Sequence, residues 1–164
     1  MKQPFILTLV SSVACAATAA NKAPENTTPT KSKTPNVVFI YADDLGYGDL
    51  ECYGAKNVQT PNVNRLAKSG ILFTNAHATA ATSTPSRYSM LTGEYAWRKE
   101  GTDVAAGNAG MIIRPEQYTM ADMFKSVGYT TAAVGKWHLG LGDQTATQDW
   151  NAPLPCALGD LGFD

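Results

Sequence analysis

The sequence predicts an α/β fold with a mostly parallel central sheet, and the prediction rests on three neighbouring segments. Residues 37–41 (Val-Val-Phe-Ile-Tyr) form a continuous β-branched and aromatic run, which is typical of a strand covered on both faces. Residues 60–70 carry the signals of a short helix, and residues 71–73 (Ile-Leu-Phe) predict a second strand. A strand, a helix and a strand in this order indicate an α/β domain.

The first predicted helix has a recognisable start and end. Thr60 is expected to be its N-cap, and Pro61 falls in the first turn, where the missing N–H of proline is tolerated. Gly70 follows the last helical position and is expected to end the helix. Three apolar side chains recur on one face at helical spacing: Val63, Leu66 and Ala67.

A second helix is predicted to begin at Pro85 or Ser86 and to end at Thr92, because Gly93 follows. Ser83 then lies where a loop enters this helix, with the proline suited to the first turn.

A third helix is predicted over about residues 119–127, with Gly128 as its stop. Residues 130–134 predict a further strand, and Gly135 begins a loop at its end. The apolar positions of this third helix are Met120, Met123, Phe124 and Val127.

The bulk composition indicates one globular domain and excludes one class of partner. The chain has 164 residues, 44% of them hydrophobic and 16% charged. Its formal net charge is −1, so no basic excess exists to displace counterions from a phosphate backbone. We therefore expect no nucleic-acid partner.

Residues 1–20 are typical of an export signal. Lys2 gives a positive start, residues 5–13 are mostly apolar, and Ala17-Thr18-Ala19 resembles a cleavage site. The apolar run is too short to span a bilayer, which needs about 20 apolar residues, so no transmembrane helix is expected. Cys15 offers an alternative, a lipid anchor. Either way, we expect the protein to be exported to the periplasm or secreted.

Residues 21–35 are rich in Pro, Thr, Lys and Asn and predict a flexible linker. The folded part is expected to comprise residues 36–164. Cys52 and Cys156 have no local C-x-x-C spacing, so a disulfide between them and two free thiols are both open.

Ser83 and Arg87 are the first candidate catalytic residues. A nucleophile at the start of a helix is exposed to free backbone N–H groups and to the positive end of the helix dipole. Arg87 lies four residues later and projects from the same helix face. A helix-capping serine with a surface arginine would give the same short string.

Asp43 and Asp44 are the candidate metal ligands. They follow the predicted strand at residues 37–41, at the edge where α/β folds bind ligands. Adjacent carboxylates repel each other unless a cation neutralises them, and they suit a hard divalent ion such as Ca²⁺. A solvated Asp-Asp turn is the alternative.

Lys136 and His138 lie in the loop after the predicted strand at residues 130–134. If the segment were extended, both side chains would point to one face. A cation beside an imidazole fits binding of a tetrahedral anion and transfer of its protons. Solvated loop residues would give the same pattern.

Longer patterns around these residues resemble type I sulfatases. Residues 40–48 resemble the metal loop of that family, and residues 135–140 (Gly-Lys-Trp-His-Leu-Gly) resemble its second signature. The resemblance extends from Val37 to Asp164. Seven positions within eleven residues match the first signature: Ser83, Pro85, Ser86, Arg87, Leu91, Thr92 and Gly93.

The resemblance implies roles for five of the six candidate residues. Ser83 would be oxidised to formylglycine by a radical-type maturase, because this chain has serine where the other branch has cysteine. Asp43 and Asp44 would bind one Ca²⁺ together with residue 83. Lys136 would contact the sulfate group, and His138 would hydrogen-bond a hydroxyl of formylglycine.

The implied activity is hydrolysis of sulfuric esters, on sulfated glycans or aryl sulfates, in an alkaline-phosphatase-like sandwich. A phosphodiesterase or phosphonate monoester hydrolase of the same superfamily and an inactive secreted fragment are the alternatives. The remaining metal ligands and the acid for the leaving group are expected further along the family's sequence. We therefore expect residues 36–164 to be a truncated N-terminal part of the catalytic domain.

Overall fold

The computed structural model describes residues 34–144 and 149–164. The predicted signal sequence (1–20), including Cys15, and linker residues 21–33 lie outside the described residues.

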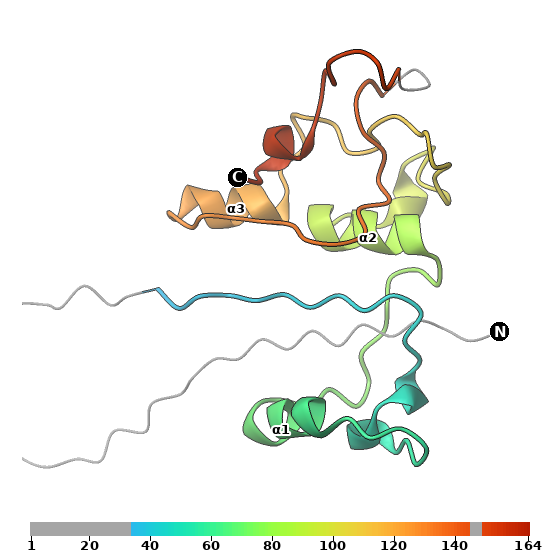
Figure 1. The fold of residues 1–164 in the computed structure, drawn as a ribbon, viewed down its shortest axis with the longest axis vertical. Helices are drawn as coiled ribbons and strands as arrows, with labels where there is room; N and C mark the ends of the chain where they lie inside the picture. Colours follow the sequence, from blue (N-terminus) through green and yellow to red (C-terminus); the bar gives the residue numbers. More distant parts are fainter. Residues whose placement is uncertain (1–33, 145–148) are drawn as a thin grey trace, which may run out of the picture. The chain divides into compact units, whose positions relative to one another are not determined.

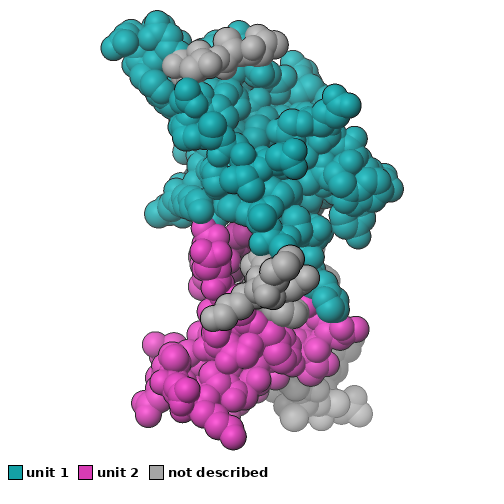
Figure 2. Space-filling view, turned by 90° about the vertical axis from the view of Figure 1, so that its right-hand side faces the viewer, with its two compact units in different colours: residues 1–4, 77–164 teal, residues 5–76 magenta. Residues whose placement is uncertain are grey.

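The chain divides into two compact units, coloured separately in Figure 2. We call their described parts the N-terminal unit (residues 34–76) and the C-terminal unit (residues 77–144 and 149–164).

The N-terminal unit is built around one α-helix, α1, at Pro61–Ser69. Thr60 is its N-cap and Gly70 its C-cap, as the sequence predicts. The Glu51 carboxylate accepts hydrogen bonds from the Thr60 N–H and from Asn64 Nδ2, the latter at 2.7 Å. Two short 3-10 helices precede α1, η1 (Tyr47–Asp49) and η2 (Glu51–Tyr53), and these bonds tie the start of α1 to η2.

The two strands predicted for the N-terminal unit are not formed. Residues 37–41 run as an extended segment (blue in Figure 1) with no strand assigned, and residues 71–73 form none either. A strand exists only when its backbone pairs with a neighbouring strand. A run of apolar residues indicates a tendency to be buried but does not provide that neighbour. The apolar side chains here are largely uncovered: Val38 is 75% and Ile40 70% exposed.

The C-terminal unit contains α2 (Ser83–Thr92), η3 (Ala96–Arg98), α3 (Met120–Ser126) and η4 (Leu158–Leu161), shown in Figure 1. The strand predicted at residues 130–134 is not formed, and Val134 is fully exposed. Side chains from α2 and from the loops around it make the core of this unit: Tyr88, Leu91, Ala96, Met111, Ile113, Leu139, Cys156 and Leu161.

Helix α3 starts and ends within a residue of its predicted bounds, 119–127. Thr119 and Asp122 form a reciprocal capping box, which satisfies two backbone N–H groups at the helix start. The Thr119 hydroxyl also donates to the Leu161 carbonyl oxygen at 2.8 Å, so the same residue ties α3 to η4.

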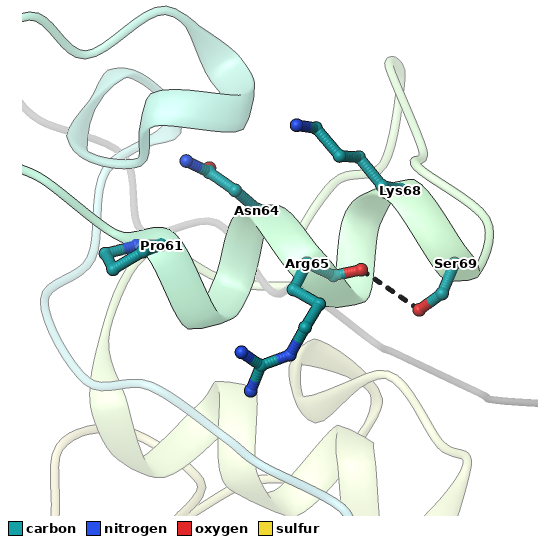
Figure 3. A pocket seen from close by; sticks show the side chains of 5 residues that line it. All are labelled: Pro61, Asn64, Arg65, Lys68 and Ser69. Atoms are coloured by element: carbon teal, nitrogen blue, oxygen red, sulfur yellow. Dashed lines mark hydrogen bonds between the residues drawn. The ribbon is translucent and has the colours of Figure 1, made fainter.

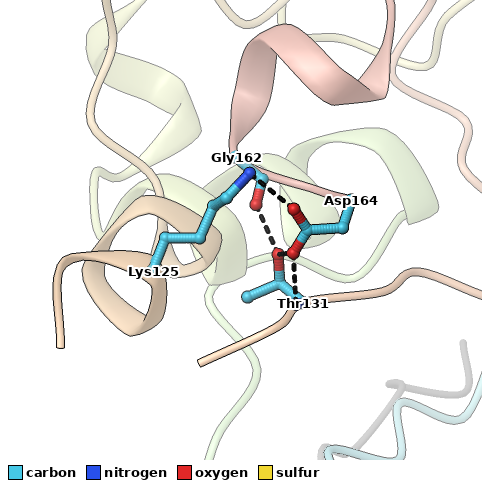
Figure 4. Close-up of polar contacts among 4 residues, drawn as sticks. All are labelled: Lys125, Thr131, Gly162 and Asp164. Carbon is cyan, nitrogen blue, oxygen red and sulfur yellow. Dashed lines mark hydrogen bonds and ion pairs between the residues drawn. The ribbon is translucent and has the colours of Figure 1, made fainter. Parts of the chain in front are cut away.

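Residues 131 and 164 form a clasp beside α3 (Figure 4). The Thr131 N–H donates to Asp164 Oδ2 at 2.8 Å, and the Thr131 hydroxyl donates to the Gly162 carbonyl oxygen at 2.5 Å. Lys125 Nζ lies 2.8 Å from Asp164 Oδ1. This clasp fastens the last described residues to the end of α3.

Across the described residues no strand is assigned, so they do not contain the predicted parallel sheet. None of their helices is both long and apolar enough to cross a membrane. Cys52 and Cys156 are both free thiols, and burial raises the pKa of the Cys156 thiol.

Candidate active site

The site begins at the N-terminus of α2, where Ser83 is the first helical residue. The helix therefore starts two residues before the earliest predicted start, Pro85. The fixed φ of proline is compatible with any first-turn position, so the proline did not mark the boundary. Thr82, the N-cap, makes no side-chain capping hydrogen bond, and Gly93 ends the helix in the left-handed conformation (φ 71°) as predicted. Ser83 thus lies among the backbone N–H groups of a helix start.

The Ser83 hydroxyl lies between two side chains that the sequence also singled out. Arg87 Nε donates to Ser83 Oγ at 2.9 Å, as expected for residues four apart on one helix face. His138 Nδ1 lies 3.0 Å from the same oxygen. The structure therefore brings together Ser83, Arg87 and His138, although the histidine is 55 residues away in sequence.

The other ring nitrogen of His138 determines where its hydrogen lies. Nε2 is 3.0 Å from the Ala105 carbonyl oxygen, which can only accept a hydrogen bond. Nε2 therefore carries the hydrogen, and in the neutral ring Nδ1 presents its lone pair to Ser83 Oγ. In this state the Ser83 hydroxyl receives a hydrogen bond from Arg87 and donates one to His138.

Arg87 links α2 to the loop that carries the histidine. Its side chain is 8% exposed, and its Nη1 donates to the carbonyl oxygen of Lys136 at 2.5 Å. A buried guanidinium keeps its charge, so this residue holds a fixed positive charge next to the hydroxyl. The side chain of Lys136 is exposed, in contrast to that of His138.

Residues 135–140 are not extended, so the expectation that Lys136 and His138 share a face is not met. Gly135 has φ 114° and His138 has φ 57°, both left-handed. Gly140 (φ 70°) lies so close to another loop that an added Cβ would be 1.8 Å from the Gly110 carbonyl oxygen. These backbone conformations turn the histidine ring back onto α2.

The predicted metal ligands lie in the N-terminal unit. Asp43 and Asp44 are both exposed, and Asp44 has a left-handed backbone (φ 56°). The Asp49 carboxylate accepts the Gly46 N–H at 2.7 Å, so it caps η1 at the end of the same loop.

The donor chemistry of this loop fits a hard divalent cation in part. Two adjacent carboxylates supply ligands that Ca²⁺ prefers, whereas a complete Ca²⁺ shell has about six to eight oxygens. In the part of the chain that the structure describes, no three His, Cys, Asp or Glu side chains are grouped to hold a metal.

The opposite side of α2 is fixed by a buried tyrosine. Tyr88 is fully buried, and its hydroxyl donates to Glu94 Oε2 at 2.8 Å and accepts from Gln117 Nε2 at 2.9 Å. Burial, reinforced by the Glu94 carboxylate, raises the pKa of this phenol, so it stays protonated. Lys99 lies over the ring, with Nζ 5.5 Å from its centroid, and burial followed by the nearby Arg114 lowers the pKa of this amine. Tyr88 directly follows Arg87, so the cluster holds α2 in place beside that arginine.

A surface pocket lies elsewhere, along α1 of the N-terminal unit (Figure 3). Its lining includes Arg65, Lys68 and Ser69, and the Ser69 hydroxyl donates to the Arg65 carbonyl oxygen at 3.0 Å. None of the predicted site residues lines it, so we do not assign the chemistry to this pocket.

Two residues at the site were missed by the sequence analysis. The Ala105 backbone carbonyl contacts His138, and its loop of small residues gives no sequence signal. Thr84 follows Ser83 directly, and its hydroxyl bonds to the backbones of His138 and Ala105, each at 3.0 Å. Its position inside the first motif was the available signal.

Comparison with known proteins follows the same motifs. Residues 35–164 match the family model of the sulfatases. The chain is 51% identical over 147 residues to an N-acetylgalactosamine-6-O-sulfatase of Bacteroides thetaiotaomicron, covering 90% of the chain and 29% of that relative. It is 42% identical over 118 residues to human arylsulfatase A, covering 70% of the chain and 23% of that relative. The chain thus spans less than a third of the length of these curated relatives.

Solved structures give a consistent result. One, described with the metabolism of multiple glycosaminoglycans by Bacteroides thetaiotaomicron, is 54% identical with a TM-score of 0.78, covering 81% of this chain and 28% of that one. The crystal structure of Ps i-CgsB is 32% identical with a TM-score of 0.57, covering 74% and 25%. Both likenesses agree with the match to the sulfatase family model, whereas the described residues contain no assigned strand and so do not show the α/β class.

Proposed function

Because the chain belongs to the sulfatase family, we propose that residues 36–164 are an N-terminal part of the catalytic domain of a sulfuric ester hydrolase. The observation that carries the proposal is the placement of Ser83 Oγ, 2.9 Å from Arg87 Nε and 3.0 Å from His138 Nδ1 at a helix start. A positive charge and a proton acceptor then contact one hydroxyl at a helix start. Such neighbours are typical of an activated nucleophile.

Residue 83 is proposed to act after conversion of Ser83 to formylglycine by a radical-type maturase. The hydrated aldehyde supplies two hydroxyls on one carbon, one to attack sulfur and one whose deprotonation expels sulfate by C–O cleavage. A serine sulfate would be a stable ester, so an unmodified hydroxyl would leave the protein blocked after one turnover. The seven matching motif positions support this modification at residue 83.

The residues of this chain have separable tasks in such a reaction. His138 Nδ1 is placed to accept the proton of a hydroxyl on residue 83, because Nε2 is committed to Ala105. The Arg87 guanidinium and the start of α2 stabilise negative charge that develops on oxygen. Lys136, whose side chain is exposed, is proposed to contact an oxygen of the sulfate group.

Asp43, Asp44 and residue 83 are proposed to hold one Ca²⁺. A bound divalent ion would supply positive charge to the sulfate oxygens and to the attacking oxygen. The two exposed carboxylates support this assignment as a partial ligand set.

The proposed substrate is a sulfated glycan. The name of the relative that is 51% identical refers to a 6-O-sulfated N-acetylgalactosamine. Aryl sulfates are the second substrate class, since human arylsulfatase A is 42% identical.

Export to the periplasm or secretion is proposed from residues 1–20, which lie outside the described residues. Cleavage of the signal gives a free protein, whereas lipidation of Cys15 would anchor it. Radiolabelled palmitate incorporation, compared with a Cys15→Ala variant, distinguishes the two.

Parallel kinetics test the proposed reaction. The complete protein, co-expressed with a serine-type maturase, is assayed for kcat/KM on an aryl sulfate, a 6-O-sulfated amino sugar and a phosphonate monoester. We expect the sulfate esters to be preferred and a Ser83→Ala variant to be inactive. A preference for the phosphonate ester, or equal turnover by Ser83→Ala, would contradict the proposal.

A further inference from the structure

The hydroxyl of Thr84 connects α2 to both loops that hold the histidine. This side chain is fully buried, and it lies between Ser83 and Pro85 in the first motif. Its Oγ1 donates to the carbonyl oxygen of His138 at 3.0 Å and accepts the Ala105 N–H at 3.0 Å. One buried hydroxyl therefore satisfies a donor on one loop and an acceptor on the other.

These bonds close a ring with the contact that sets the histidine tautomer. The Ala105 residue gives its N–H to Thr84 and receives the His138 Nε2 hydrogen on its carbonyl oxygen. The His138 backbone in turn gives its carbonyl oxygen to Thr84. The same hydroxyl therefore contacts the backbone of the residue that accepts the Nε2 hydrogen and the backbone of the residue that carries the imidazole.

The backbone of His138 needs such support. Its φ of 57° is left-handed, a conformation that residues other than glycine rarely adopt and that persists only when the surroundings impose it. Removing the hydroxyl would leave the partly buried Ala105 N–H and His138 carbonyl oxygen without this partner, which favours movement of both loops.

From this ring we propose that Thr84 is a positioning residue, which holds His138 in the Nε2–H tautomer with the Nδ1 lone pair directed at residue 83. Thr84 acts through His138 and Ala105 and need not touch the substrate. Its effect on catalysis rests on the proposed function, whereas its effect on the tautomer does not.

The tautomer is measured by ¹⁵N NMR of the imidazole ring, at a pH where the ring is neutral. The full chain with unmodified Ser83 suffices, and it has only two histidines, His77 and His138, so a His77→Gln variant assigns the signals. A nitrogen that carries hydrogen and one that does not have well-separated ¹⁵N shifts. The readout is therefore independent of maturation and of any activity.

Three variants separate positioning from general stability. Thr84→Val removes the hydroxyl at nearly constant shape, and Thr84→Ser keeps it. Thr102→Val is the matched control, because Thr102 is also buried and its hydroxyl bonds to the carbonyls of Ala96 (2.6 Å) and Lys99 (2.8 Å), neither of which belongs to the ring. If Thr84→Val does not fold, Thr84→Ala gives the same comparison without placing a methyl group against the two backbone groups.

We expect wild type, Thr84→Ser and Thr102→Val to show hydrogen on Nε2 of His138, and Thr84→Val to show a mixture of tautomers. In the complete, formylglycine-bearing enzyme, Thr84→Val should lower kcat by about 10- to 100-fold with a smaller change in KM, since misplacement of a reacting group has this size of effect. Thr84→Ser should remain close to wild type.

Three results would overturn the inference. Hydrogen on Nδ1 in the wild-type chain would do so at once, whatever the protein hydrolyses. An unchanged tautomer in both Thr84→Val and Thr84→Ala, or an equal shift in Thr102→Val, would also do so. Absence of sulfatase activity with the wild-type tautomer intact would instead count against the proposed function alone.

Discussion

The two units of the chain differ in how their chemistry-bearing residues are supported. In the C-terminal unit, the Ser83 hydroxyl lies between the buried Arg87 and the half-buried His138, and hydrogen bonds hold both side chains. Among the described residues of the N-terminal unit, Leu50 alone is buried, and Asp43 and Asp44 are exposed. A nucleophile can thus be assembled from one helix start and two loops, whereas paired carboxylates on an exposed loop need further oxygens to hold a metal.

The largest effect is expected when Arg87 is removed, because this residue supplies the fixed positive charge next to the Ser83 hydroxyl. Arg87→Ala should lower kcat/KM of the complete, formylglycine-bearing enzyme by about 10²- to 10³-fold, the usual effect of deleting one donor to a developing oxyanion. The control is Arg98→Ala, which removes an exposed arginine from the same unit. If Arg87→Ala lowers kcat/KM less than tenfold, or if both variants lower it equally, Arg87 does not have this role.

Asp43 and Asp44 test the N-terminal unit, where the proposed role is metal binding. Asp43→Asn and Asp44→Asn should each lower Ca²⁺ affinity of the complete protein by about 100-fold, since a carboxylate ligand is lost. Isothermal titration calorimetry measures this, with Asp49→Asn as the control, because that carboxylate accepts the Gly46 N–H instead. The ¹⁵N shifts of His138 should stay unchanged in all three. A control variant that loses as much Ca²⁺ affinity would show that the wrong carboxylates were assigned.

Gly140 tests how tightly the loop of the histidine is packed. Gly140→Ala adds a Cβ 1.8 Å from the Gly110 carbonyl oxygen in a left-handed residue, so the loop must shift. We expect a loss of about 2–4 kcal/mol in the free energy of unfolding, from strain and overpacking together. Gly128→Ala is the matched control, with φ 88° and open space around its Cβ position, and should lose about 1–2 kcal/mol. Equal losses in chemical denaturation would mean that the close approach carries no cost.

The smallest effect concerns acid stability at the clasp of Thr131 and Asp164. The hydrogen bond from Lys125, followed by that from the Thr131 N–H, lowers the pKa of the Asp164 carboxyl below its usual 3.8. A carboxyl whose pKa is lowered by folding stabilises the native state above its unfolded pKa, and this contribution is lost as the pH falls through the folded pKa. The free energy of unfolding should therefore decline less steeply with falling pH, below the unfolded pKa of 3.8, in Asp164→Asn than in wild type. Identical slopes would show that the clasp is not formed in solution.

The sequence predicted more of the candidate site than of the fold. Spacing placed Ser83 at a helix start with Arg87 on the same face, and both positions are confirmed by the contacts of α2. The contact of His138 with Ser83 followed from the family resemblance alone, because its left-handed backbone is set by tertiary packing and has no local signal. Roles of Lys136 and of the two aspartates stay predictions.

The bounds of the three α-helices were predicted within three residues because caps, prolines and glycines are local signals. The strands at residues 37–41, 71–73 and 130–134 were not formed, because an apolar run records a preference for burial, while a strand requires a paired neighbour. The role of Thr84 could not be predicted, because its hydrogen bonds to two distant loops have no local sequence signal.

Mass spectrometry of the peptide that contains residue 83 tests whether Ser83 is converted to formylglycine. After co-expression of the protein with a serine-type radical maturase, trypsin should release residues 69–87 as one peptide, bounded by Lys68 and Arg87. We expect this peptide to be lighter by two hydrogens and fragmentation to place the loss at Ser83, with Ser69 and Ser86 unchanged. An unmodified Ser83, found while a known serine-type sulfatase is converted in the same cells, would contradict this expectation.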